Sequence, residues 1–280
     1  MHTHPIRAAV FDIDGTLAMM DKSKGTYTAL PGAIEALKTL ESRGVTVLAY
    51  TNGTFFPPAH YYPILADAGL VLRPDHVWTP GVVAARALHQ NGYKRVMVLG
   101  AEGTQTPIRE AGIEVVPAEA GMEDVDAIML GWSKDFASPN LEAICETIWA
   151  QDVPVYAASV APFFASSNGR MLGVSGAVSA MVEYVTGVKV TVLGKPSTIG
   201  ADMIAELTGI PPQETVVIGD DPALEIAMGR RAGSLTVGVT TGLNDNAAFQ
   251  SFEEDIRANV VIDSLQGFAD QPWLKLGDKT

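Results

Sequence analysis

The sequence contains a single cysteine and no long apolar run. Because Cys145 is the one cysteine among 280 residues, an intrachain disulfide is excluded, as is common in a reducing compartment. No run of about 18 apolar residues occurs, so no membrane-spanning helix is predicted. The first residues hold no apolar run of signal-peptide length before the first expected strand. We therefore expect a cytoplasmic protein without a membrane partner.

Positive charge is also scarce. The chain has 19 Lys and Arg residues against 32 Asp and Glu residues, a formal net charge of −13. A field of this sign repels nucleic acids and anionic membrane surfaces, so neither is expected as a partner. It also repels phosphorylated ligands. Any phosphate site in this chain therefore needs a local positive charge or a metal ion.

The patterns that are present indicate an α/β protein with a doubly wound parallel sheet. Hydrophobic residues make up 47% of the chain, and its length suits two globular domains. Short apolar runs alternate with segments of helical spacing, which is typical of parallel sheets. Strands are expected at 8–11, 45–50, 95–99, 113–116, 127–130, 153–157, 190–193, 215–218 and 235–239. Helices are expected at 31–43, 61–68, 82–90, 139–149, 198–207 and 224–232. The glycine-rich stretch 171–176 is interpreted as a return crossing, and the tail from Asp270 as a surface segment.

The first expected strand ends in two carboxylates. Asp12 and Asp14 follow the apolar run AAVF, and Gly15 then permits a sharp turn. Ligands of open parallel α/β sheets bind beyond the carboxyl ends of the strands. Two acids at this position therefore indicate a site.

Polar groups of matching chemistry follow three further apolar runs. They are Thr51 with Asn52, then Lys195, and finally Asp220 with Asp221. If the runs are parallel strands, these side chains meet along one edge. Carboxylate oxygens favour Mg²⁺, hydroxyl and amide groups bind phosphate oxygens, and a lysine supplies a positive charge. The set suits phosphoryl transfer. One leading acid can act as a nucleophile while the other protonates the leaving oxygen and later deprotonates water.

The order and spacing of these motifs resemble the haloacid dehalogenase superfamily of phosphatases. The motifs are D-x-D-G-T at 12–16, T-N-G at 51–53, G-K-P at 194–196 and G-D-D-x-x-x-E at 219–225. G-x-x-G-A at 173–177 and V-x-T-G at 239–242 further resemble its NagD-like, p-nitrophenyl-phosphatase-like subfamily. That resemblance implies a Rossmann-like core of residues 1–79 and 188–280. Residues 80–187 would form an α/β cap inserted between the second and third motifs.

The resemblance also implies a role for each matching residue. Asp12 would be the nucleophile, and Asp14 the general acid and base. Lys195 would neutralise charge on the phosphoaspartate, and Thr51, Asn52 and Gly53 would hold the phosphoryl oxygens. Mg²⁺ would be bound by Asp12, by the backbone carbonyl of Asp14 and by Asp220. Glu225 and Asp221 would support the metal ligands from behind.

Some positions depart from the subfamily pattern. Glu225 stands where an aspartate is usual, and it is either a support of the metal site or an ordinary acid in a first helical turn. Asp221 is either a neighbour of the metal ligand or a helix N-cap. The cap loop 158–164 has small and aromatic residues where the subfamily has polar ones, which favours a less polar leaving group. Phe163 and Phe164 are equally well explained as cap core.

These observations together predict a Mg²⁺-dependent phosphatase acting on a small phosphorylated metabolite such as a sugar, glycerol, glycolate or nucleotide phosphate. A phosphotransferase of the same superfamily shares every motif, and a non-catalytic phosphate-binding protein on the same fold is the alternative from another class. A dehalogenase is disfavoured, because Asp14 suits protonation of an ester leaving group. Since caps of this subfamily often mediate dimers, the resemblance also implies a homodimer through the cap.

Overall fold

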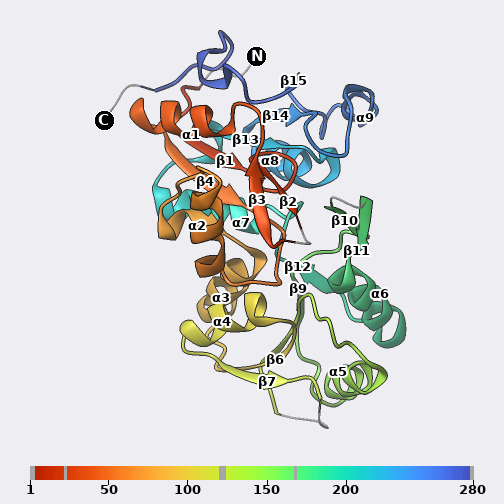
Figure 1. Ribbon diagram of the computed structural model, residues 1–280. Helices are drawn as coiled ribbons and strands as arrows, with labels where there is room; N and C mark the ends of the chain where they lie inside the picture. Colours follow the sequence, from red (N-terminus) through yellow and green to blue (C-terminus); the bar gives the residue numbers. More distant parts are fainter. Residues whose placement is uncertain (1–3, 22–23, 120–123, 167–168, 278–280) are drawn as a thin grey trace.

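The chain folds into two parallel sheets, each covered by helices, in a computed structural model that describes residues 4–21, 24–119, 124–166 and 169–277 (Figure 1). In the view of Figure 1 the sheet that contains the first and the last strand in chain order lies above the other. Alternating strands and helices and two parallel sheets confirm the predicted α/β class with a doubly wound core and a second, inserted α/β unit.

Among the described residues the core sheet has six parallel strands in the order β15-β14-β13-β1-β4-β5. These strands are β1 (Ala8–Phe11), β4 (Thr46–Tyr50), β5 (Val77–Trp78), β13 (Thr215–Gly219), β14 (Leu235–Val239) and β15 (Val260–Ile262). Strand β1 is central and buried, with β13 on one side and β4 on the other. The chain order therefore reverses direction beside β1, which is where open α/β sheets bind ligands.

The second sheet, in the part of the chain that the structure describes, has five parallel strands in the order β12-β9-β8-β6-β7. They are β6 (Arg95–Leu99), β7 (Glu114–Pro117), β8 (Ala127–Leu130), β9 (Val155–Ala157) and β12 (Val190–Val192). The last of these corrects the predicted division at residue 188. Strand β12 was expected to open the returning core segment, but it pairs with β9 and so belongs to the second sheet.

Helices cover both faces of each sheet. They are α1 (Ala33–Ser42), α2 (Pro58–Asp67), α3 (Pro80–Gln90), α4 (Glu102–Glu110), α5 (Ser138–Gln151), α6 (Val174–Thr186), α7 (Ile199–Thr208), α8 (Ala227–Ala232) and α9 (Asn246–Gln250). Because strand side chains alternate between faces, Phe11 of β1 packs with α1 and α2, whereas Val10 packs with α3, α7 and α8. The cluster around Val10 also contains Val96 and Met129 of the second sheet, so one apolar core joins the two sheets through α3.

Several elements differ from the sequence-based expectation. The stretch 171–176, expected to be a return crossing, contains the end of β11 (Gly169–Leu172) and the start of α6. Strand β11 pairs antiparallel with β10 (Phe163–Ser166), and β2 (Ala18–Asp21) pairs with β3 (Thr26–Ala29); neither hairpin was predicted. The tail is packed: Leu274 is buried, and Ile6 forms a β-bridge with Leu276.

The carboxyl ends of the two sheets face each other. The loop after β4 reaches the loops after strands of the second sheet, because Thr54 Oγ1 accepts a hydrogen bond of 3.2 Å from the backbone N–H of Trp132, which follows β8. Phe55 O accepts one of 3.2 Å from the N–H of Gly103 in the first turn of α4. Polar residues from both sheets are therefore brought to the same space. Among the described residues, no helix is long and apolar enough to span a bilayer.

Candidate active site

Three of the predicted site residues lie at adjacent strand ends of the core sheet. Asp12 follows β1, Thr51 follows β4 and Asp220 follows β13, and all three are buried. The sheet ladder continues one residue past the strands, since the N–H of Asp12 donates to Ile218 O at 2.9 Å and the N–H of Thr51 to Trp78 O at 3.1 Å. The backbone that carries these side chains is therefore fixed by the sheet.

Lys195 reaches the same place from the second sheet. It follows β12, so the expectation that all four polar groups end strands of one sheet is wrong for this residue. Its side chain is almost fully buried. The ammonium Nζ donates to Asp12 Oδ1 at 2.5 Å and to Tyr50 O at 2.7 Å, and it lies 2.5 Å from Glu225 Oε1. The lysine thus contacts the predicted nucleophile directly.

Glu225 and Asp221 were predicted to support the metal ligands, but in the structure they contact Lys195 and backbone N–H groups. Glu225 pairs with Lys195 through Oε1, and its Oε2 accepts a hydrogen bond of 3.2 Å from the N–H of Asp221. Asp221 is the N-cap of the π-helical turn Pro222–Ile226, and its Oδ1 accepts from the N–H of Ala223 at 2.8 Å. Of the two sequence interpretations of Asp221, the geometry supports the helix cap.

Two glycines enclose the carboxylate of Asp220. A Cβ atom at Gly242 would lie 1.7 Å from Asp220 Oδ2, and one at Gly15 would lie 2.5 Å from the same atom. Gly15 also has φ of +94°, which disfavours any side chain. The two loops are joined, since Thr241 Oγ1 donates to Gly15 O at 2.6 Å. The glycines of D-x-D-G-T and V-x-T-G therefore make room for one carboxylate.

The site holds more negative than positive charge. Burial raises the pKa of Asp12 to about 8; the charge of Lys195 opposes this rise, and the charges of Glu225 and Asp14 add to it. Burial also raises the pKa of Asp220, as does the charge of Asp12. Burial lowers the pKa of Lys195, but the charges of Asp12 and Glu225 outweigh that effect and raise it overall. One ammonium faces several carboxylates, so a further cation would stabilise the site.

The donor set fits a hard divalent cation such as Mg²⁺. Asp12 and Asp220 offer carboxylate oxygens from neighbouring strand ends, and the backbone carbonyl expected from Asp14 would come from the turn next to Gly15, which lies against Asp220. Within the described ranges, no three His, Cys, Asp or Glu side chains converge as a metal site by themselves. A site with two carboxylates and a carbonyl, completed by water and phosphate, agrees with both observations.

The side chains of the T-N-G motif make two kinds of contact, one within the loop and one with Lys195. Thr51 Oγ1 accepts a hydrogen bond of 3.0 Å from the N–H of Gly53, which holds the loop in a tight turn. The side-chain amide of Asn52 points to the backbone of Lys195, to which it both donates and accepts at 2.9 Å. The side-chain amide of Asn52 and the N–H of Gly53 are therefore both engaged by the protein, so the predicted phosphate-binding role of Asn52 would have to use its backbone.

Two tyrosines that the sequence analysis did not identify lie at the site. Burial raises the pKa of Tyr27, and so do the charge of Asp14 and a side-chain hydrogen bond with it. The hydroxyl of Tyr61 lies close to Gly53, since a Cβ atom at Gly53 would be 2.5 Å from it. Burial raises the pKa of Tyr61, and the charges of Asp14 and Asp12 raise it further. Neither tyrosine stands in a motif, and both have the spacing of core residues, so the sequence contained no local signal.

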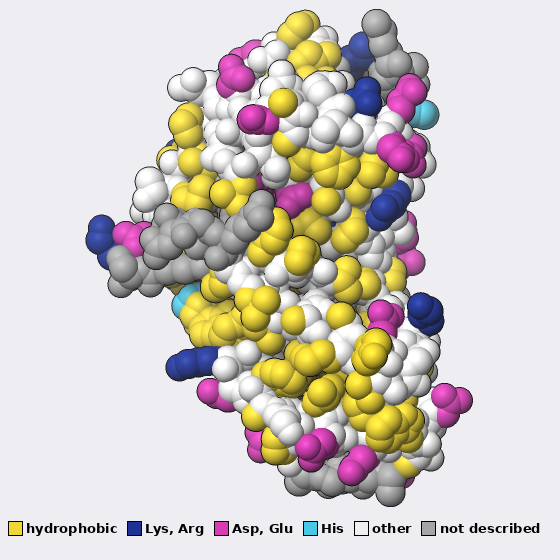
Figure 2. Space-filling model, turned by 90° about the vertical axis from the view of Figure 1, so that its right-hand side faces the viewer, with side chains coloured by type: hydrophobic (Ala, Val, Ile, Leu, Met, Phe, Trp, Pro, Cys, Tyr) yellow, Lys and Arg dark blue, Asp and Glu magenta, His cyan; other side chains and the backbone are white. Residues whose placement is uncertain are grey.

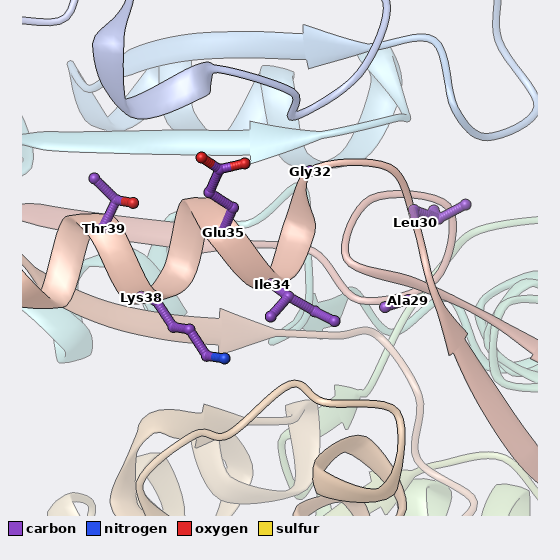
Figure 3. Close-up of a pocket in the computed structure, with 7 residues that line it drawn as sticks. All are labelled: Ala29, Leu30, Gly32, Ile34, Glu35, Lys38 and Thr39. Carbon is purple, nitrogen blue, oxygen red and sulfur yellow. The ribbon is translucent and has the colours of Figure 1, made fainter.

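A surface hollow of about 430 Å³ lies elsewhere, along α1 and the end of β3. Figure 3 shows its lining residues, in which Glu35 and Lys38 extend to opposite sides of α1. Their polar atoms do not converge on a common point. The hollow therefore offers no set of groups comparable to the carboxylates and lysine at the sheet ends.

Comparison with known proteins agrees with this geometry. The family model described as haloacid dehalogenase-like hydrolase matches residues 9–114, and a second, HAD-hydrolase-like model matches residues 192–268. Chronophin of Mus musculus is 26% identical over 270 residues, which cover 92% of this chain and 90% of chronophin.

Two solved structures extend the likeness to the whole fold. A 4-nitrophenylphosphatase from Thermotoga maritima matches with a TM-score of 0.83 and 25% identity over 95% of this chain and 97% of its own. The glycerol phosphate phosphatase of Mycobacterium tuberculosis, solved in complex with magnesium, matches with a TM-score of 0.80 and 22% identity over 93% of this chain and 75% of its own. The chain therefore belongs to the haloacid dehalogenase-like hydrolases and is a phosphatase, with the fold of the nitrophenylphosphatases.

Proposed function

We propose that the protein is a Mg²⁺-dependent phosphatase that hydrolyses a small phosphomonoester through an aspartyl-phosphate intermediate on Asp12. The observation that carries the proposal is the contact of 2.5 Å between Lys195 Nζ and Asp12 Oδ1, within a buried site that also contains Asp220. Phosphatases among its relatives, including one that acts on glycerol phosphate, support the class of substrate.

In the first step an oxygen of the Asp12 carboxylate attacks the phosphorus, and the bond from phosphorus to the leaving oxygen breaks. Asp14 gives its proton to that oxygen, so the alcohol leaves neutral. Negative charge accumulates on the phosphoryl group during transfer, and the ammonium of Lys195 balances this charge. Tyr27 holds Asp14 through their side-chain hydrogen bond. The N–H of Asn52 would donate to a phosphoryl oxygen, whereas the N–H of Gly53 already donates to Thr51 Oγ1.

In the second step Asp14 takes a proton from water, and the water oxygen attacks the phosphorus. The bond between phosphorus and the Asp12 oxygen breaks, which releases inorganic phosphate and restores both carboxyl groups. Asp12, Asp220 and the carbonyl of Asp14 would hold Mg²⁺. When bound, the metal supplies positive charge to the phosphate oxygens and keeps Asp12 ionised.

The first experiment is hydrolysis of p-nitrophenyl phosphate at neutral pH, with Mg²⁺ or with EDTA, by the wild type and by Asp12→Asn. We expect turnover that needs Mg²⁺ and that falls by about 10³-fold or more in the variant. Equal activity of the variant would contradict the role of Asp12. If the wild type is folded but inactive, trapping with beryllium fluoride distinguishes a site that excludes this probe from one that binds without catalysis.

The alternatives make different predictions in the same assay. A phosphotransferase would transfer the phosphoryl group to added glycerol or glucose in preference to water. A phosphate-binding protein without activity would bind inorganic phosphate and show no turnover with any small phosphate ester. The presence of Asp12, Asp14 and Lys195 disfavours the non-catalytic alternative, whereas a phosphotransferase would share these residues and differs only in the acceptor of the phosphoryl group. The cytoplasmic location remains a prediction from cysteine usage.

We also propose a homodimer through the second unit. Helices α5 and α6 pack side by side and carry large exposed side chains, with Trp149 62% and Tyr184 92% exposed. Figure 2 shows hydrophobic side chains gathered over the lower half of its face, where Figure 1 places α6. A second copy would cover them. Light scattering of the wild type and of Tyr184→Glu tests this, and a monomeric wild type would contradict it.

A further inference from the structure

The side-chain amide of Asn52 forms hydrogen bonds with both the backbone N–H and the backbone carbonyl of Lys195. Its Oδ1 accepts from the N–H of Lys195 at 2.9 Å, and its Nδ2 donates to the carbonyl oxygen of the same residue at 2.9 Å. We propose that Asn52 is a positioning residue for Lys195, acting through these two bonds and not as a side-chain ligand of phosphate. The inference rests on the proposed function for the role of Lys195.

The side chain of Asn52 has little capacity left for a ligand. Asn52 is buried, and its Nδ2 also lies 3.4 Å from the hydroxyl of Ser159, in the loop that follows β9 of the second sheet. An amide group has two donor hydrogens and an oxygen with two lone pairs, and the contacts with Lys195 O and Ser159 Oγ use both donors, which are the groups that a phosphate oxygen could engage. A phosphate oxygen that approached this amide would have to displace a protein partner.

The chain that carries Lys195 passes Asn52 without spare room. A Cβ atom at Gly194 would lie 2.7 Å from Asn52 Oδ1 and 2.1 Å from the carbonyl oxygen of Ala158. Glycine therefore allows this close approach. The backbone position of Lys195 is set by Asn52 on one side and by the second sheet on the other, where Leu193 donates to Ala157 O at 2.9 Å.

The backbone of Lys195 has to be fixed relative to Asp12 because the two residues follow strands of different sheets. Asp12 belongs to the core sheet, whereas Lys195 follows a strand of the second sheet. The distance between Nζ and Asp12 therefore depends on how the two sheets are held together at this edge. Asn52 follows β4, next to β1, so its amide fixes the lysine backbone relative to the strand beside the nucleophile. A displacement of about 1 Å at a reacting group can cost about 10²-fold in rate.

The kinetic test compares Asn52→Ala and the near-isosteric Asn52→Asp with Asn259→Ala. Asn259 is a matched control, because its amide oxygen accepts from the N–H and the hydroxyl of Thr236 at 2.9 Å each, between β14 and β15. With p-nitrophenyl phosphate, we expect both Asn52 variants to lower kcat by about 10²-fold and to change KM by less than about threefold. Asn259→Ala should keep the wild-type kcat.

A double-mutant cycle then asks whether Asn52 acts through the lysine. If it does, Asn52→Ala has no further effect on the residual kcat of Lys195→Ala, measured at high enzyme concentration. If the amide of Asn52 instead bound phosphate directly, Asn52→Ala would raise KM and the inhibition constant of inorganic phosphate. The fold-losses in activity of Asn52→Ala and Lys195→Ala would then multiply in the double variant. The latter result would overturn the proposal.

A second readout does not depend on catalysis. The buried ammonium of Lys195 should be protected from acetylation by acetic anhydride in the wild type and in Asn259→Ala, as measured by mass spectrometry of the native protein. We expect its acetylation rate to rise at least about tenfold in Asn52→Ala. An unchanged rate would contradict the positioning role. If the wild type fails to hydrolyse any phosphate ester, this measurement still tests the contact, so the two failures are distinguishable.

Discussion

Glu225 and Asp12 contact the same ammonium group from two different elements. Lys195 Nζ lies 2.5 Å from Oδ1 of Asp12 and 2.5 Å from Oε1 of Glu225, and all three side chains are buried. Glu225 belongs to the helical turn after β13, and Asp12 follows β1. The lysine is therefore held between two strands of the core sheet, although its own strand belongs to the other sheet.

Removing Glu225 should destabilise the protein far more than removing an exposed acid. Glu225→Ala leaves Lys195 paired with Asp12 but removes the acceptor of the Asp221 N–H, and a buried unsatisfied group costs about 1–3 kcal/mol, so we expect the melting temperature to fall by roughly 5 °C. Glu102→Ala is the control, since Glu102 pairs with Arg109 on the surface at 3.1 Å and such pairs contribute about 0–1 kcal/mol. Equal melting temperatures of the two variants would contradict a stabilising pair.

A methyl group at Gly242 should disturb the site itself. Because its Cβ would lie 1.7 Å from Asp220 Oδ2, the carboxylate must move, and we expect Gly242→Ala to lose about 10²-fold in kcat/KM and to need more Mg²⁺. Gly92→Ala is a suitable comparison, since Gly92 has φ of +77° and no atom within 4 Å of its Cβ position. It should lose about 1 kcal/mol of stability and keep its activity. Similar activity of both variants would show that Asp220 tolerates the shift.

The two neighbouring acids Asp220 and Asp221 should respond differently to Mg²⁺. Binding of a ligand at 100 times its Kd stabilises a protein by about 2.7 kcal/mol, so Mg²⁺ should raise the melting temperature of the wild type. Asp220→Asn should abolish this rise. Asp221→Asn should retain it, because Asn is also a good N-cap and the carboxylate of Asp221 serves Ala223. Loss of the Mg²⁺ effect in Asp221→Asn would restore its predicted role at the metal.

Asp126 should contribute stability only above acidic pH. Hydrogen bonds from the N–H groups of Lys94 and Arg95, at 2.6 and 2.9 Å, hold the pKa of Asp126 below its usual value. A lowered folded-state pKa means that the contribution is present above the unfolded pKa of about 3.9 and is lost as the pH falls through the folded value. Since Asp126 is exposed, we expect Asp126→Asn to lower the melting temperature at pH 7 by about 1–2 °C. Scans at pH 7, 4 and 2.5 check this, and a difference that does not decrease as the pH falls would contradict it.

The core strands were predictable because buried parallel strands have a continuous apolar sequence. Runs such as Ala8–Phe11 and Thr215–Ile218 are flanked by helical spacing, and the polar residues that follow them indicated the site edge. The pattern alone thus predicts that Asp12, Thr51 and Asp220 lie close together. It depended on the regular geometry of parallel sheets, in which strand ends share one edge.

The remainder depended on long-range packing that local patterns do not contain. The apolar run at Val190–Val192 suits an edge strand of either sheet, so the origin of Lys195 was not predictable. The contact of Glu225 with this lysine depends on a π-helical turn, which has no sequence signature here. Tyr27 lies in a hairpin of four-residue strands, too short to be detected by periodicity. Each of these features is determined by where distant segments meet.

The position of β1 has a consequence for synthesis of the protein. Ala8 pairs with Thr215, so one neighbour of the central strand is made more than two hundred residues after it. A nascent or truncated chain that stops before β13 leaves one side of β1 without its ladder partner, and exposed apolar strand edges associate with other chains. We infer that the core sheet is completed late in translation. During synthesis, Ala8–Phe11 would therefore stay without one of its pairing strands for a long time, and chaperones that bind extended apolar segments could bind there.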